Sequence, residues 1–151
     1  MSWAMSEPST LAVIDARLVR MRDDFHEGRE WVYGILDSTE REVLGGVGLH
    51  PRSQPDALDI GYWLRVDATG RGYATEAASA ITRVAFEGLG VPRLEIRCDP
   101  RNVRSAAVPR RLGYRHTRTL EKDSTTPDGR PRDTMVWELT ADEFLGRPLS
   151  A

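Results

Sequence analysis

The stretch 69–76 reads Thr-Gly-Arg-Gly-Tyr-Ala-Thr-Glu and lies between a strand-like segment and a helix-like one. Residues 57–66 carry apolar side chains at alternating and adjacent positions, as a half-buried strand does, and the apolar residues of 75–87 fall on one helical face. Glycines let the backbone approach a ligand closely, and the first amides of a helix are unpaired donors. This order of strand, glycine loop and helix predicts a phosphate site, although a purely structural turn would also use glycine.

Four motifs resemble those of the GNAT N-acetyltransferases and occur in the same order. The window 69–74 is similar to the acyl-CoA-binding motif of that family. The segments 59–64 (Asp-Ile-Gly-Tyr-Trp-Leu), 99–105 (Asp-Pro-Arg-Asn-Val-Arg-Ser) and 112–114 (Leu-Gly-Tyr) resemble its RimJ/RimL-like branch of protein-acetylating enzymes. The likeness runs from about Trp31 to Leu139. Thr69 departs from the pattern, since the family often has Gln or Arg there, and one expected contact is thereby weakened.

The predicted elements agree with a single α/β (α+β) domain over residues 1–151, a GNAT-like mixed central sheet flanked by helices. Ser9 or Thr10 can cap a helix that ends near Gly28, and its apolar spacing predicts a face packed against the core. Strands are expected at 31–36, 43–49, 59–66 and 94–98, and a short helix after Asn102. Residues 114–121 and 134–139 are expected to form a closing hairpin, and the alternation of strand and helix before it predicts local parallel pairing.

Compared with the family, the chain has no counterpart of the first strand and first helix before Ser9, so we expect a GNAT domain that is short at its amino terminus. Either the natural start lies upstream, or the sheet exposes an unpaired edge that the second subunit of a homodimer covers. In related enzymes the absent elements help to line the acceptor side. The CoA half of the site is therefore expected to be better preserved than the substrate half.

Composition indicates an ordinary soluble domain, with 40% hydrophobic residues, 29% charged residues and a net charge of −2. This charge does not favour nucleic acid, and no apolar run is long enough to span a membrane. The arginines between 101 and 118 form either a local site for adenosine phosphates or a solvated helix face. Cys98 is the single cysteine and shares strand parity with Leu94 and Ile96, so we expect a buried thiol in a cytoplasmic protein. Histidine and cysteine spacing predicts no metal site.

The resemblance implies that a primary amine attacks acetyl-CoA directly in a ternary complex. The acceptor would be a protein N-terminus or a small molecule. Asp59 is the first candidate for the general base, because the family often has an acidic residue on this strand; a carboxylate facing solvent is the alternative interpretation. His50, at the end of the preceding strand, is the second candidate.

Many GNAT enzymes use a tyrosine seven residues after the Asn of the second helix to protonate the CoA thiolate, and Pro109 stands at that position here. Ser105 is the predicted substitute, because Asn102 and Ser105 lie on one helical turn. Tyr114 is a more distant alternative. Relatives often have a glutamate where Thr117 stands, so no role is assigned to Thr117.

The full set of residues predicted to bind the cofactor is Leu64, Val66, Arg71, Gly72, Tyr73, Ala74, Thr75, Asn102 and Ser105. Pyrophosphate would lie against the amides of 71–75, and pantetheine between the strands 59–66 and 94–98. A backbone amide near 64–66 would face the reacting carbonyl oxygen. The alternative function is a non-catalytic acyl-CoA-binding or regulatory module, favoured by Pro109 and the short amino terminus. A nucleotide-binding domain is a third hypothesis, but no Gly-Lys-Ser or Gly-Lys-Thr follows the glycines.

Overall fold

The computed structural model describes residues 10–52 and 54–146. Its elements, in chain order, are α1 (Leu11–His26), β1 (Trp31–Leu36), β2 (Val43–Pro51), β3 (Ala57–Leu64), a 3-10 turn (Val66–Ala68), α2 (Tyr73–Arg83), a π-helical turn (Val84–Gly88), β4 (Arg93–Cys98), α3 (Val103–Arg111), β5 (Arg115–Thr125), β6 (Pro131–Thr140) and α4 (Ala141–Leu145).

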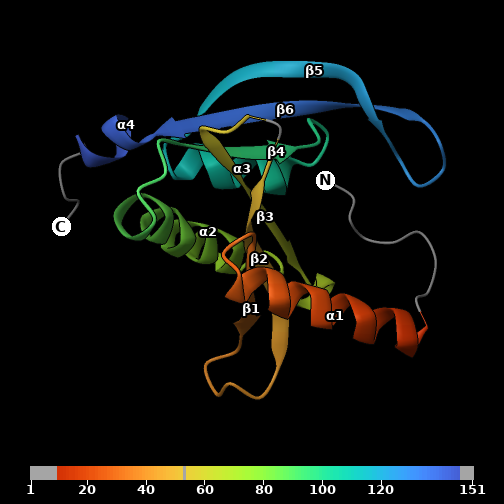
Figure 1. The fold of residues 1–151 in the computed structure, drawn as a ribbon. Coiled ribbons are helices and arrows are strands. Elements are labelled where there is room, and N and C mark those ends of the chain that lie inside the picture. Colours follow the sequence, from red (N-terminus) through yellow and green to blue (C-terminus); the bar gives the residue numbers. More distant parts are fainter. Residues whose placement is uncertain (1–9, 53, 147–151) are drawn as a thin grey trace.

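The six strands form one mixed sheet in the order β1-β2-β3-β4-β6-β5. Neighbouring strands are antiparallel except β3 and β4, which are parallel and joined by the crossover through α2. This confirms the predicted mixed sheet and its local parallel pairing. Figure 1 shows β3 at a steep angle to β4, with the long β5–β6 hairpin at the opposite end of the molecule from β1.

The parallel strands β3 and β4 separate halfway along their length. They pair only from Ala57–Arg93 to Ile60–Ile96, although β3 continues to Leu64 and β4 to Cys98. Beyond Ile60, β3 stays paired with β2 as far as Leu64, so it turns away with β2. The sheet therefore opens between β3 and β4, and this opening positions the site.

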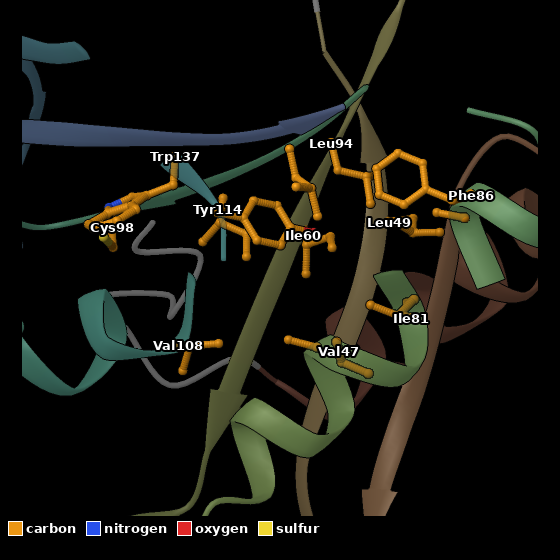
Figure 2. Packing of buried hydrophobic residues seen from close by; sticks show 14 of the residues in the cluster. Val47, Leu49, Ile60, Ile81, Phe86, Leu94, Cys98, Val108, Tyr114 and Trp137 are labelled. Atoms are coloured by element: carbon orange, nitrogen blue, oxygen red, sulfur yellow. The ribbon is translucent and has the colours of Figure 1, made fainter. Parts of the chain in front are cut away.

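The core lies between one face of the sheet, which we call the core face, and the helices α2 and α3. Leu49, Ile60, Leu94 and Leu139 from four strands are at most 1% exposed. Each such side chain contributes about 1.5–3 kcal/mol to folding. Figure 2 shows Leu49, Ile60 and Leu94 gathered between the strands and the two helices, with Tyr114 among them.

The expectation that α1 packs a face against the core is wrong. The helix forms where its spacing predicts, with Thr10 as its cap, but none of its residues is buried, and Leu11 is 80% exposed. A 16-residue helix is about 24 Å long, whereas α1 meets the sheet chiefly near its end, where the Phe25 ring lies 5.4 Å from the Tyr33 ring. Apolar spacing identified the helix but not what covers it.

Element boundaries also differ from the sequence-based expectations, and one helix was missed. The strand predicted at 59–66 ends at Leu64, and the helix predicted at 75–87 begins at Tyr73 and widens into a π-helical turn. The helix α4 was not predicted, although Thr140 and Glu143 form a capping box that the sequence displays. Phe144 of α4 stacks on Phe86 at 5.0 Å between ring centroids, which joins α4 to the core.

Candidate functional site

The glycine loop leads directly into α2. Gly70 and Gly72 have φ of +77° and +83°, a conformation that L side chains rarely adopt, and a Cβ built on either would meet nothing within 4 Å. Glycine is therefore required by the backbone, and the space in front of it is open. Gly72 caps α2, and the amide of Glu76 makes the first helical bond to its carbonyl. The amides of 73–75 precede that bond and are left as donors.

A cavity of about 190 Å³ lies where β3 and β4 separate. Successive strand residues point to opposite faces, and adjacent residues of both strands line the cavity, so its lining includes residues that belong to each face of the sheet. Its lining consists of Ile60, Gly61, Tyr62, Arg97, Cys98, Asp99, Asn102, Ser105 and Arg132.

The start of α3 forms one wall of this cavity and also contacts the glycine loop. The side chain of Asn102 caps α3 by accepting from the amide of Ser105 at 3.1 Å. Arg104, in the same turn, donates to the hydroxyl of Thr69 at 2.9 Å. The cavity and the loop are thus neighbouring parts of one surface, and Thr69 makes a contact of its own at the position where the family often has Gln or Arg.

Tyr62 is a cavity residue that the sequence analysis did not single out. Its hydroxyl donates to the backbone carbonyl of Ser105 at 2.8 Å, and the Ser105 hydroxyl lies 3.4 Å from the phenol oxygen. Burial raises the pKa of Tyr62, so the phenol stays protonated at neutral pH. The sequence carried one signal for this residue: Tyr62 points to the same side of its strand as Ile60, and that strand leads to the glycine loop.

The opposite face of the sheet, which we call the charged face, carries a row of ionisable side chains in register. His50, Asp59, Glu95 and Glu138 lie side by side on β2, β3, β4 and β6. Glu95 accepts hydrogen bonds from Arg93, Arg97 and Arg118 on its two oxygens. Burial opposes ionisation of Glu95, but Arg97 and Arg118 outweigh it and lower its pKa. Glu95 is therefore a saturated, structural carboxylate.

Asp59 differs from Glu95 in its hydrogen bonding and in the direction of its pKa shift. It is fully buried, so the interpretation as a carboxylate facing solvent is wrong. Its Oδ2 accepts from Arg52 at 2.7 Å, whereas its Oδ1 is buried with no hydrogen-bond partner among the described residues. Burial raises the pKa of Asp59 against the opposing effect of Arg52. A buried acceptor oxygen without a donor favours binding of a further hydrogen-bond donor.

The remaining candidates lie in different surroundings. The His50 Nδ1 is 3.4 Å from Glu30, beside Asp59 in register. Tyr114 is buried in the core and shares a 2.8 Å hydrogen bond with Thr82, and it is not part of the cavity lining. The predicted burial of Cys98 is confirmed at 1% exposure, and burial raises the pKa of its thiol.

Among the predicted cofactor-binding residues, the structure brings Asn102 and Ser105 to the cavity and 71–75 to the glycine loop. Leu64 pairs with Gly45 at the end of β3, and the Val66 side chain is 89% exposed after the strand. Neither lines the cavity, and their role stays a prediction.

The arginines of 101–118 do not form one anion site. Arg118 pairs with Glu138 and Glu95, Arg115 with Glu143, and Arg101 with Asp99. The Arg110 guanidinium lies 5.8 Å from the centre of the Trp137 ring. Arg104, beside Thr69, is the member of this group that is placed to meet a ligand at the glycine loop.

A larger cavity of about 540 Å³ lies between β1, β2 and α2. Apolar side chains such as Tyr33, Ile35, Val47 and Ile81 line most of it, and it holds no pairing of an acid with a base that would serve catalysis. Within residues 10–52 and 54–146, no group of three or more His, Cys, Asp and Glu side chains is arranged to hold a metal ion. No helix of the described part of the chain is long and apolar enough to cross a membrane.

Comparison with known proteins gives a family match: the model of the acetyltransferase (GNAT) domain matches residues 1–115. The chain is 27% identical over 131 residues to the uncharacterized N-acetyltransferase p20 of Bacillus licheniformis, covering 85% of this chain and 73% of that protein. It is 28% identical over 127 residues to the ribosomal protein uS5-alanine N-acetyltransferase of Escherichia coli, covering 82% of this chain and 65% of that protein. Among solved structures, Mycobacterium smegmatis RimJ in complex with CoA-disulfide is 25% identical, with a TM-score of 0.78 over 93% of this chain and 71% of that one. The chain thus spans about two thirds to three quarters of the length of these relatives.

Proposed function

Because the chain belongs to the acetyltransferase (GNAT) domain family, we propose that it is a single-domain N-acetyltransferase that moves an acetyl group from acetyl-CoA to a primary amine by direct attack in a ternary complex. The observation that carries this proposal is the cavity between the separated strands β3 and β4, which is lined by residues of both faces of the sheet and is adjacent to the glycine loop. We propose that a thioester and an amine approach this cavity from opposite faces of the sheet.

The residues present fit the phosphate end of CoA. The left-handed Gly70 and Gly72 leave open space before the first amides of α2, where an anion is stabilised by free N–H donors and the helix dipole. Arg104 lies at the same loop through its bond to Thr69, and Arg71 lies between the two glycines. The β3 backbone beyond Ile60, no longer paired with β4, offers hydrogen-bonding groups to pantetheine along the cavity.

Asp59 is the residue we assign to the acceptor amine. It immediately precedes the cavity residues of β3, and its unpartnered Oδ1 can accept a hydrogen bond from an ammonium group. Its raised pKa brings the carboxylate closer to the range useful for a general base. Arg52 holds the other oxygen and fixes the orientation of the carboxylate.

Ser105 is the residue we assign to the departing sulfur. As the amine nitrogen bonds to the acetyl carbon, the C–S bond breaks and its electron pair stays on sulfur. The Ser105 hydroxyl lies in the cavity and can donate a hydrogen bond to that charge, while Asp59 takes the proton that the amine loses. Two positions support these assignments: Ser105 lines the cavity, and Asp59 immediately precedes the cavity residues of β3.

The named relatives support a choice of acceptor class. Because the similar E. coli protein acetylates the alanine of ribosomal protein uS5, we propose a protein N-terminus as the first acceptor to test, in the cytoplasm, with small-molecule amines second. We also propose that the protein forms a homodimer.

The test is calorimetric titration of the chain with acetyl-CoA, followed by thiol release with N-terminal peptides and small amines. Binding with acceptor-dependent thiol release supports the transferase. Binding of acetyl-CoA without release to any acceptor supports the acyl-CoA-binding module instead. No binding at all contradicts both.

A further inference from the structure

The proline inside α3 leaves a specific carbonyl without its helical partner. In an α-helix the amide of residue i bonds to the carbonyl of residue i−4. Pro109 has no amide hydrogen, and its ring crowds the carbonyl of Ser105. That carbonyl belongs to the first turn of α3 and lies beside the cavity, where an unsatisfied acceptor is costly.

Tyr62 supplies the missing donor from the opposite wall of the cavity. Its hydroxyl donates to the Ser105 carbonyl at 2.8 Å, a normal length for a strong O–H···O bond. The bond joins β3 to α3 across the point where β3 leaves β4. Tyr62 and Ser105 are 43 residues apart in sequence, so this bond links two distant segments that form facing walls of the cavity.

The same phenol oxygen also holds the Ser105 side chain. The Ser105 hydroxyl donates to it across 3.4 Å, near the outer limit for a hydrogen bond. A bond of that length keeps the hydroxyl in the cavity but is weak enough to be exchanged for a better acceptor. A sulfur that acquires negative charge is such an acceptor.

We propose that Tyr62 is a positioning residue for acetyl transfer, which holds the Ser105 hydroxyl at the departing sulfur through the carbonyl that Pro109 leaves free. The inference rests on the proposed function, since it assigns Tyr62 a role in that reaction. No proton leaves Tyr62 or Ser105: both donate hydrogen bonds, and the proton of the amine goes to Asp59. The proline and the tyrosine thus act as a pair.

The experiment measures acetyl transfer by Tyr62→Phe, with Tyr114→Phe as the matched control. Both changes remove one phenol hydroxyl, but the Tyr114 hydroxyl bonds Thr82 in the core and Tyr114 does not line the cavity. We expect kcat of Tyr62→Phe to fall about two- to tenfold, the equivalent of one hydrogen bond, with KM for acetyl-CoA nearly unchanged. Tyr114→Phe should keep kcat within about twofold. In a Ser105→Ala background, the tyrosine change should lower kcat no further.

A second measurement tests the pairing with Pro109 without any activity. Pro109→Ala restores an amide that can bond the Ser105 carbonyl, so the loss of unfolding free energy on Tyr62→Phe should be smaller in that background. Additive effects in this double-mutant cycle would overturn the pairing. Equal loss of kcat in Tyr62→Phe and Tyr114→Phe, or full additivity with Ser105→Ala, would overturn the positioning role. If no variant and no wild type transfers acetyl, the proposed function fails, and the unfolding cycle still decides the Tyr62–Pro109 link.

Discussion

Replacing Gly72 by alanine tests separately how this glycine affects the stability of the fold and the affinity for CoA. Gly72 has φ of +83° and an alanine Cβ would meet nothing within 4 Å. The substitution therefore destabilises the folded chain only because an L residue must adopt a left-handed backbone conformation there. For an L residue that destabilisation is about 1–2 kcal/mol. Since each kcal/mol lowers Tm by about 2–4 °C in a domain of this size, the expected shift is about 2–8 °C.

Gly90 offers a matched control. Its φ is +65°, a Cβ built there also meets nothing within 4 Å, and it lies between the π-helical turn and β4, away from the glycine loop. Gly90→Ala should therefore lower Tm by a similar amount. It should leave the Kd for CoA unchanged.

The two variants should differ in affinity. If phosphate oxygens approach the amides that follow Gly72, a Cβ in that space breaks at least one hydrogen bond to a charged group, worth about 1.5–3 kcal/mol. Titration calorimetry should then show Kd for CoA about ten- to a hundredfold higher in Gly72→Ala than in Gly90→Ala. Equal affinities, with both proteins folded by circular dichroism, would refute the assignment of the loop.

Further predictions concern three other sites. Asp59→Asn should lower kcat about a hundredfold or more, the usual loss of a general base. Because the pKa of the Asp59 carboxyl is raised in the folded chain, the folded wild type binds the carboxyl proton more tightly than the unfolded chain does. Its unfolding free energy should therefore fall as pH rises from about 4 through that raised pKa. Urea unfolding should show no such loss in Asp59→Asn. Thr140→Ala removes the capping box of α4 and should cost about 1 kcal/mol, or about 2–4 °C in Tm; an unchanged Tm would contradict a stabilising role for that cap. The buried Cys98 should react with dithionitrobenzoate at least about tenfold more slowly in the native chain than in urea, and equal rates would contradict its burial.

Local signals in the sequence predicted much of this architecture. A few neighbouring residues specify each of three features that the structure contains. These are the positive φ angles of Gly70 and Gly72, the helix cap at Asn102 and the alternating side-chain pattern of β3. The spacing of Asn102 and Ser105 placed them on one helical turn, and both line the cavity in the structure, whereas their contact with a ligand stays a prediction. Such features are predictable because short-range sterics and hydrogen bonds determine them.

Contacts between distant segments were not predictable in this way. The burial of Asp59 depends on Arg52 and on the charged face formed by four strands, and the contact of Tyr62 depends on a carbonyl 43 residues away. The sequence displayed the cause of the second contact, since Pro109 lacks an amide, but not the donor that replaces it. The exposure of α1 likewise depends on how much sheet lies beneath it and not on its own periodicity.

The position of β1 at the edge of the sheet has a consequence for handling the protein. Within the described sheet β1 has a neighbour on one side only, and its six residues, Trp31–Leu36, include no charge and no proline (Figure 1). Edge strands of soluble proteins usually carry such groups, because they prevent one molecule from adding its strand to another. The cavity beside Tyr33 and Ile35 adds an apolar surface next to the same edge. Overproduction at high temperature or storage at high concentration therefore favours aggregation that begins at β1, and soluble yield will depend on conditions that keep this strand covered or the protein dilute.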